Sequence, residues 1–382
     1  MAGHTNPFRF GALARDDSFT DREPELAELR ADARNGQDVV IFAPRRYGKT
    51  SLVDRLQQAL IADRILVGQV NLMTCPTRAR FAEKLAELVW EAYAGPLARA
   101  RDAAVRIFRG LRVSPVIGLD PDSGRMTFSF AGAARASDLD ATIERLLELI
   151  AELATERERR AVVIFDEFQE VVGLDRGLPK LLRSVFQEQP EVCHLYLGSK
   201  RHMMEQIFND EDEPFWRSAK HLELGPIPAG AFIAYIGQRF RDSGRRTDAG
   251  VAERVLELTG GHPYATQELC YFLWEETPRR GIARLGALDA ALTAVLRSEN
   301  AHFSLLWDGL AAGQRVLLTA LAVEPGRPLT EAYRSRHPGL PAASATQKAL
   351  EALARQEIII RDGGHATIGE PFLDAWIRAE IL

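Results

Sequence analysis

The sequence has little cysteine and no apolar run long enough to cross a membrane. Only three of its 382 residues are cysteine, and they lie too far apart for a metal-binding motif: Cys75, Cys193 and Cys270. They indicate buried thiols in a reducing compartment. The longest uncharged stretch, residues 224–238, contains glycine and proline and is too short to span a bilayer. Residues 1–6 are polar, without the apolar centre of a signal peptide, so we expect a cytoplasmic protein without a membrane partner.

The sequence also lacks an excess of positive charge. A net charge of −5 and a pI near 6.0 argue against a protein that is basic throughout and binds nucleic acid, although they are compatible with a local basic patch. Hydrophobic residues make up 46% and charged residues 26%, which is typical of a globular protein. At about 150 residues per domain, the length predicts two or three domains.

Residues 39–56 contain the most informative motif of the chain. A β-branched run, 39–42, leads into Ala-Pro-Arg-Arg-Tyr-Gly-Lys-Thr-Ser at 43–51 and then into a helical pattern. This order matches a phosphate-binding loop (Walker A), in which backbone N–H groups and a helix N-terminus face a polyphosphate. Ala43 replaces the first glycine of the motif. The alternative is a solvated turn before a surface helix.

The phosphate-binding loop predicts a site for ATP or ADP with Mg²⁺. Lys49 would contact the β- and γ-phosphates, and the Thr50 hydroxyl would bind Mg²⁺. The remaining nucleotide-binding candidates are the other residues of the loop: Pro44, Arg45, Arg46, Tyr47, Gly48 and Ser51.

Residues 161–167 form a second decisive stretch (Walker B). Five successive apolar residues, 161–165, predict a strand buried on both faces of a parallel sheet. Asp166 and Glu167 follow at its carboxyl end, where buried carboxylates require cations or solvent. We expect Asp166 to hold Mg²⁺ through water and Glu167 to deprotonate the attacking water. The alternative is that Asp166 caps the next helix.

A further strand, 193–198, ends at Ser199. In ATPases of this build, a polar side chain at the tip of a neighbouring strand touches the γ-phosphate or the water, and Ser199 occupies that place. The alternative is a helix cap.

The pattern of elements predicts three domains. Residues 1–227 form a P-loop ATPase domain with a hairpin insert at about 104–136, in which short β-rich runs flank a turn at 120–124. Helical patterns dominate 228–300, a helical lid. Residues 301–382 read as helices followed by a two-stranded wing, the pattern of a winged helix, a fold that often binds DNA. Over 314–382 the Arg and Lys residues are matched in number by Asp and Glu residues, which argues against a surface that binds DNA phosphates.

Five stretches together resemble the archaeal-type ATPase family, prokaryotic P-loop ATPases of the AAA+ and STAND class. They are residues 19–23, 43–52, 165–169, 197–199 and 260–263. The resemblance covers nearly the whole chain, with Asp21 and Ala43 in place of glycine. It implies an α/β fold: a three-layer α/β/α parallel sheet with an extra strand between the phosphate-loop and Asp-Glu strands, a helical lid, and a C-terminal winged helix.

The resemblance implies roles for residues outside the central motifs. Phe19 and Arg22 fall in an N-terminal motif that lines the base or ribose, and Pro263 falls on a lid proline near adenine. From the residues alone, Phe19 would staple the first helix to the core and Arg22 would be solvated. Arg217 falls where AAA+ relatives place an arginine finger, which contributes about 10³ to 10⁵ in rate. Arg201 is a competing candidate.

These features predict a slow Mg²⁺-dependent ATPase that acts as a switch, whose nucleotide state controls the arrangement of lid and winged helix. One alternative is a nucleotide-gated DNA-binding protein resembling origin-binding initiators. Another is a scaffold with permanently bound ADP and negligible turnover. The partner would be a protein, a second copy of the chain or, with weaker support from the charges, DNA.

Overall fold

The computed structural model describes residues 5–11, 22–42, 46–94, 107–121, 124–130 and 135–382. The chain divides into two compact units. We call the first, Arg22–Arg45 with Lys49–Gly225, the sheet unit, and the second, Met1–Asp21 with Arg46–Gly48 and Pro226–Leu382, the helical unit.

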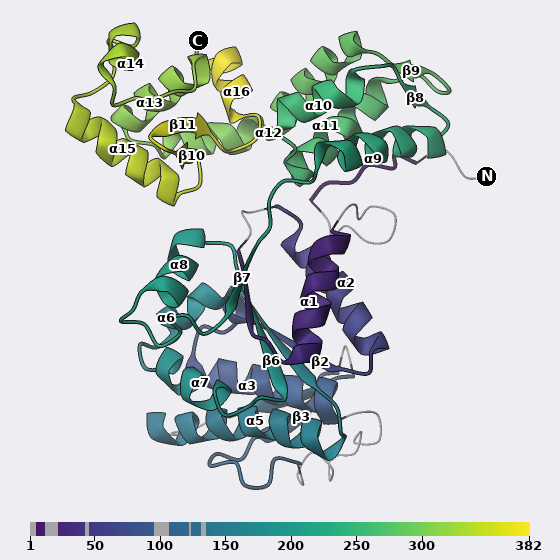
Figure 1. Ribbon diagram of the computed structural model, residues 1–382, viewed down its shortest axis with the longest axis vertical. Coiled ribbons are helices and arrows are strands. Elements are labelled where there is room, and N and C mark those ends of the chain that lie inside the picture. The colour runs from purple at the N-terminus through teal and green to yellow at the C-terminus, as the bar shows by residue number, and fades with distance from the viewer. Residues whose placement is uncertain (1–4, 12–21, 43–45, 95–106, 122–123, 131–134) are drawn as a thin grey trace. The chain divides into compact units, whose positions relative to one another are not determined.

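The sheet unit is built on five parallel strands in the order β2-β5-β6-β1-β7 (Figure 1). The strands are β1 (Val39–Phe42), β2 (Leu66–Asn71), β5 (Ala161–Asp166), β6 (Val192–Gly198) and β7 (Lys220–Glu223). The strand β6 lies between the phosphate-loop strand β1 and the Asp-Glu strand β5, so the predicted extra strand is confirmed.

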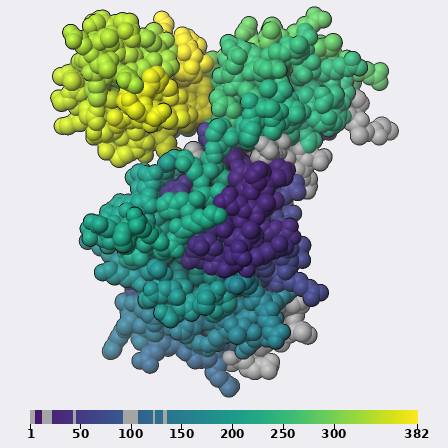
Figure 2. Space-filling view, in the orientation of Figure 1, coloured from purple at the N-terminus to yellow at the C-terminus, as the bar shows by residue number. Residues whose placement is uncertain are grey.

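Helices cover both faces of this sheet (Figure 1). The helices α1 and α2 lie on one face, and α1 is a surface helix of the unit, shown in dark purple in Figure 2. The pair Asn35-Gly36 is typical of a helix end, and α1 does end there: Gly36 adopts φ +73°, the left-handed conformation that ends helices. The helices of the unit are α1 (Glu23–Asn35), α2 (Lys49–Ala62), α3 (Arg78–Leu88), α5 (Ala136–Glu156), α6 (Val171–Leu174), α7 (Leu178–Phe186) and α8 (Arg201–Asn209), with 3₁₀ turns η2 (Leu72–Thr74) and η5 (Phe168–Glu170).

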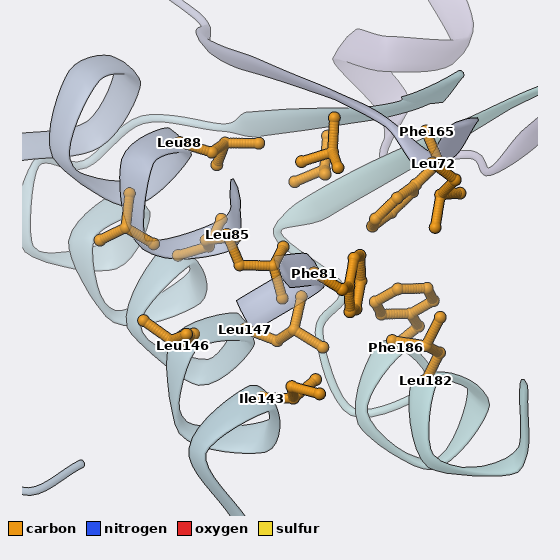
Figure 3. Close-up of a cluster of buried hydrophobic side chains, with 14 of the residues drawn as sticks. Leu72, Phe81, Leu85, Leu88, Ile143, Leu146, Leu147, Phe165, Leu182 and Phe186 are labelled. Carbon is orange, nitrogen blue, oxygen red and sulfur yellow. The ribbon is translucent and has the colours of Figure 1, made fainter. Parts of the chain in front are cut away.

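A buried core lies between the sheet and the helices α3, α5 and α7 (Figure 3). Every residue of β5 is buried, which confirms a strand covered on both faces. Alternate residues of β5, including Phe165, enter this core with Phe81 of α3, Leu147 of α5 and Phe186 of α7. The apolar residues on one side of α5 therefore pack against the face of the sheet that includes the Asp-Glu strand β5.

The predicted hairpin insert is present. The strands β3 (Val116–Leu119) and β4 (Met126–Ser129) pair antiparallel, and Phe128 packs against Phe108 with ring centroids 4.9 Å apart. The apolar residues over 78–101 have helical spacing, which predicts one helix. In the structure α3 leaves α-geometry after Leu88 and continues as a π-helix, Val89–Ala94. Residues 95–101 lie outside the described part.

The helical unit contains the lid and winged-helix elements around one continuous buried cluster. A parallel pair of two-residue strands, β8 and β9, lies among the lid helices, so our expectation of helices alone there was wrong. The wing, β10 and β11, is antiparallel as predicted. The elements are α9 (Ala229–Asp242), β8 (Arg246–Thr247), α10 (Val251–Thr259), α11 (Pro263–Glu276), β9 (Ile282–Ala283), α12 (Leu285–Asp308), α13 (Ala312–Val323), α14 (Glu331–Arg336), α15 (Ala343–Arg355), β10 (Ile359–Asp362), β11 (His365–Ile368) and α16 (Leu373–Glu380).

Residues 5–11 belong to the helical unit, which the sequence did not indicate. Phe8 is 1% exposed, and its ring lies 5.3 Å from that of Phe240 in α9. Asn6 Nδ2 donates to the Tyr271 carbonyl and to Glu275 Oε1, both at 3.0 Å. The start of the chain thus packs on the lid helices rather than on the sheet.

All three cysteines are free and buried, as the sequence predicts. Within the residues that the model describes, no helix combines the length and the apolar character needed to cross a bilayer.

Candidate functional site

The candidate site lies at the edge of the sheet where β5, β6 and β1 end. Because these adjacent strands are parallel, their carboxyl ends share that edge. Asp166 is the last residue of β5, Ser199 follows β6, and Lys49 begins α2 after the loop that follows β1.

The structure brings four predicted residues together at this edge. Lys49 Nζ lies 3.6 Å from Asp166 Oδ1 and 3.3 Å from Glu167 Oε1. Ser199 Oγ donates a hydrogen bond to Glu167 Oε2 at 2.7 Å. The side chains of Lys49, Asp166 and Glu167 are only 11%, 12% and 15% exposed, so these charges interact in a partly desolvated setting.

Both helix-capping alternatives are wrong. Asp166 Oδ1 accepts the Glu167 backbone N–H at 3.0 Å, and η5 begins after Glu167, which itself adopts the left-handed φ of +52°. Ser199 is not the cap of α8, because the N-cap residue is Lys200. Both polar side chains therefore face the site instead of the ends of the following helices.

The two adjacent carboxyls have pKa values shifted in opposite directions. Burial is the largest influence on Asp166 and raises its pKa against the charge of Lys49. Burial also disfavours the charged form of Glu167, but hydrogen bonds from Ser199 and Gln169 and the charge of Lys49 outweigh it and lower the pKa of Glu167. Neighbouring groups with separated pKa values are typical of acid–base chemistry, and the direction of the shift favours the carboxylate form of Glu167.

The described part of the phosphate-binding loop has an open turn at Gly48. Gly48 has φ +83°, and a Cβ built there would meet no atom within 4 Å. Lys49, Thr50 and Ser51 form the first turn of α2, whose N-terminus provides N–H groups suited to an anion. Pro44 and Arg45 lie outside the described residues.

Arg46 and Tyr47 group with the helical unit. The Arg46 guanidinium lies 4.2 Å from the centroid of the Tyr264 ring, and Tyr47 makes an edge contact with His262, with centroids 4.7 Å apart. These loop residues thus contact the start of α11, the helix that Pro263 opens.

The donor set fits a magnesium ion carried by a nucleotide. No cluster of three or more His, Cys, Asp or Glu side chains forms a metal cage among the described residues. Mg²⁺ bound with phosphates commonly uses only one or two protein oxygens and retains water. The exposed Thr50 hydroxyl and the Asp166 carboxylate are oxygen donors of that kind.

Of the base and ribose candidates, Arg22 and Pro263 lie in the described part of the chain. Phe19 lies outside the described residues. Arg22 is 4% exposed, so the solvated alternative for it is wrong; it donates to the Gly225 carbonyl at 2.7 Å and to Glu25 Oε1 at 2.7 Å. Pro263 is the first residue of α11, after the N-cap His262.

The two arginine-finger candidates differ in their surroundings. Arg217 adopts a left-handed φ of +50°, and its guanidinium lies 5.1 Å from the ring centroid of the exposed Trp216. Arg201 is paired with Glu205 at 2.8 Å and with Glu223 at 2.5 Å. Within the described part of the chain, neither guanidinium forms an ion pair with Asp166 or Glu167.

Our assignment of site residues missed Gln169. Its side chain is fully buried, and Nε2 donates to Glu167 Oε2 at 2.5 Å. The only signal in the sequence was its place two residues after the acidic pair in Phe-Asp-Glu-Phe-Gln.

Comparisons with known proteins agree with this geometry. A family model described as "ATPase domain predominantly from Archaea" matches residues 19–269, and one described as "Probable winged helix domain" matches residues 301–379. No curated protein matches the chain.

A solved structure shares the fold, and two others are less similar. The Walker-type ATPase of Pyrococcus abyssi is similar with a TM-score of 0.65 and 15% identity, over 97% of this chain and 99% of that one. The Aeropyrum pernix ORC1 protein, solved with DNA, has a TM-score of 0.47 and 16% identity over 96% of this chain and 94% of its own. The Thermotoga maritima RuvB Holliday junction branch migration motor has a TM-score of 0.46 and 14% identity, over 96% and 97%.

The fold is therefore that of a parallel-sheet P-loop ATPase with a C-terminal winged helix. Because the ATPase model matches more than half of the chain, the chain belongs to the family of ATPase domains found predominantly in Archaea.

Proposed function

We propose that the protein is a Mg²⁺-dependent switch ATPase of the AAA+ and STAND type, which binds ATP, hydrolyses it slowly, and uses its nucleotide state to control the lid and winged helix. One observation carries the proposal: the Lys49 ammonium lies 3.3 to 3.6 Å from two carboxylates at the strand tips, one of which accepts the Ser199 hydroxyl. P-loop ATPases use groups of these kinds to bind phosphate and metal and to position the attacking water.

Each residue has a distinct role in this proposal. Bound ATP with Mg²⁺ supplies the electrophilic γ-phosphoryl group. Lys49 balances phosphate charge, and Thr50 and Asp166 would hold the metal. Glu167, whose lowered pKa favours the carboxylate form, orients a water molecule and accepts its proton, while Ser199 fixes the Glu167 carboxylate. The contribution of Arg217 as a finger stays a proposal.

The switch requires that nucleotide favour one arrangement of the chain. Moving a two-state equilibrium from 1:99 to 99:1 needs a differential affinity of about 5.5 kcal/mol. The γ-phosphate with its metal is the chemical difference between ATP and ADP and is therefore the proposed source of this differential affinity.

The proposal includes the domain division 1–227, 228–300 and 301–382. It also includes a cytoplasmic location, which the three free cysteines support.

The decisive experiment compares Glu167→Gln with the wild-type protein. We expect the variant to bind ATP with an affinity within about threefold of wild type but to release phosphate at least about 100-fold more slowly, since general-base catalysis contributes about 10² to 10⁴. Calorimetric binding and a phosphate-release assay give the two values. Wild-type turnover by the variant would remove Glu167 from the role of base.

The described charges lend less support to DNA binding. Several cations of the winged helix are already engaged: Arg334 donates to the Pro341 carbonyl at 2.6 Å, Arg336 pairs with Glu324 at 2.9 Å, and Arg378 donates to the Ala322 carbonyl at 2.6 Å. A gel shift at low salt, with ATP and with ADP, tests this alternative. A salt-dependent shift would favour it over a protein partner or self-association.

The scaffold alternative differs from the switch in how fast bound nucleotide exchanges with nucleotide in solution. Purified protein that retains ADP for hours against excess labelled ATP would indicate a structural nucleotide. Rapid exchange would support the switch.

A further inference from the structure

The two carboxylate oxygens of Glu167 have different partners. Oε2 accepts two hydrogen bonds, from Ser199 Oγ at 2.7 Å and from Gln169 Nε2 at 2.5 Å. Oε1 faces Lys49 Nζ at 3.3 Å. Two donors on one oxygen restrict rotation of the carboxylate, because any rotation about its last bond breaks at least one of them.

Gln169 occupies its position at an energetic disadvantage. The side chain is fully buried, and among the described residues its Oε1 has no hydrogen-bond partner. An unsatisfied buried polar atom typically costs about 1–3 kcal/mol. The amide cannot gain by turning over, because its carbonyl oxygen would then face the Glu167 carboxylate. Apolar packing therefore does not explain a glutamine at this position, whereas a donor to Glu167 does.

The neighbouring strand makes room for this amide. A Cβ at Gly198 would lie 2.9 Å from Gln169 Oε1 and 2.3 Å from Cγ of Met204. The absence of a side chain at 198, one residue before Ser199, thus allows both donors to approach the same oxygen of Glu167.

We propose that Gln169 is a positioning residue that acts with Ser199 to hold the Glu167 carboxylate in one orientation, with Oε1 left as the oxygen that takes the proton from water. This proposal rests on the proposed ATPase function. Gln169 itself does not touch the reacting atoms. Because Gln169 acts through Glu167, its substitution should lower kcat without lowering stability. Substitution of a residue that only packs would lower stability.

The test uses Gln169→Met in the full-length protein. Methionine is similar in length and apolar, so it removes the donor and also the unsatisfied oxygen. We expect kcat to fall about 10- to 100-fold, because misplacement of a reacting group by about 1 Å has an effect of that size. We expect the Kd for ATP to stay within about twofold of wild type and the melting temperature not to fall. Gln169→Glu, equal in shape but repelling Glu167, should lower kcat at least as much.

Gln189→Met is the matched control. Gln189 is also buried in the sheet unit, but its Nε2 donates to the Leu147 carbonyl at 3.1 Å, away from Glu167. This variant should lower the melting temperature without lowering kcat. In a Glu167→Gln background, Gln169→Met should leave the residual rate unchanged, because the residue through which it acts is already altered.

The outcomes separate the two proposals. Wild-type kcat for Gln169→Met, together with loss of turnover in Glu167→Gln, would overturn the positioning role and leave the ATPase function standing. A parallel loss of kcat, ATP affinity and melting temperature would show that Gln169 only packs. If the wild-type protein itself binds ATP without hydrolysing it, the ATPase proposal fails, and the positioning role fails with it.

Discussion

Ser199 Oγ and Glu167 Oε2 lie 2.7 Å apart and join the ends of two neighbouring parallel strands, β6 and β5. Lys49 Nζ approaches the other oxygen of the same carboxylate at 3.3 Å. The base of the proposed reaction is therefore linked to three segments of the chain. A change in any of them is expected to reach the same carboxylate.

Lys49→Ala should remove nucleotide binding. The ammonium would contact both the β- and the γ-phosphate, and each hydrogen bond to a charged group typically contributes about 1.5–3 kcal/mol. Loss of two such bonds should raise the Kd for ATP at least about 100-fold. Calorimetry with ATP in excess Mg²⁺ measures the change. Lys180→Ala, at an exposed position of α7, is the control and should bind as wild type. Unchanged affinity in Lys49→Ala would contradict the phosphate-binding assignment.

Asp166→Asn should make turnover require more Mg²⁺. The amide is a weaker ligand than the carboxylate, so we expect the half-saturating Mg²⁺ concentration to rise about tenfold or more, and a chelator to abolish wild-type turnover. The measurement is phosphate release over a Mg²⁺ titration. Asp212→Asn, in an exposed loop, should leave the titration unchanged. An unaltered requirement in Asp166→Asn would exclude Asp166 as the metal ligand.

Glu268 gives the stability of the helical unit a pH dependence. This carboxyl is 1% exposed, and burial, with the charge of Glu299 and a hydrogen bond to it, raises its pKa to about 8 against the opposing charge of Arg46. The folded state thus holds a proton that the unfolded state, with the ordinary pKa of 4.5, releases. The contribution of Glu268 is fully present below pH 4.5 and is lost as the pH rises through 8, by up to about 1.4 kcal/mol per pH unit.

Glu268→Gln, which stays neutral, isolates this effect. Relative to wild type, its melting temperature should rise as the pH is increased from 5 to 8, because only the wild-type carboxyl must ionise. Calorimetry of both proteins at each pH gives the difference, in which other titrating groups cancel. A difference that stays constant over this range would show that Glu268 keeps the same ionisation in both states.

Phe8→Ala should destabilise the helical unit. Its side chain is 1% exposed against Tyr235 and Phe240, and truncation of a buried phenylalanine typically costs about 3–5 kcal/mol. Urea unfolding followed by tryptophan fluorescence measures the loss. Arg9→Ala, at the exposed neighbouring position, should change the free energy of unfolding by less than about 0.5 kcal/mol. Equal effects of the two substitutions would contradict the packing of residues 5–11 on α9.

Local patterns in the sequence determined which segments form helices and strands and which motifs follow the ends of the strands. The apolar run before Asp166 indicated a strand buried on both faces, since only such a strand tolerates five successive apolar residues. Because the carboxyl ends of parallel strands share one edge of the sheet, the sequence alone implied that the motifs at Lys49, Asp166 and Ser199 form one site. These inferences depend on backbone periodicity and on hydrogen-bonding chemistry within a few residues.

Only the tertiary structure decided the partners of groups distant in sequence. Arg22 reaches the carbonyl of Gly225, Phe8 packs on α9, and Glu268 meets Glu299 on the next helix. Gln169 acquires its significance only because Gly198 leaves space for its amide. Burial and the direction of a side chain depend on how distant segments pack, and no local pattern encodes which distant atom will complete a hydrogen bond.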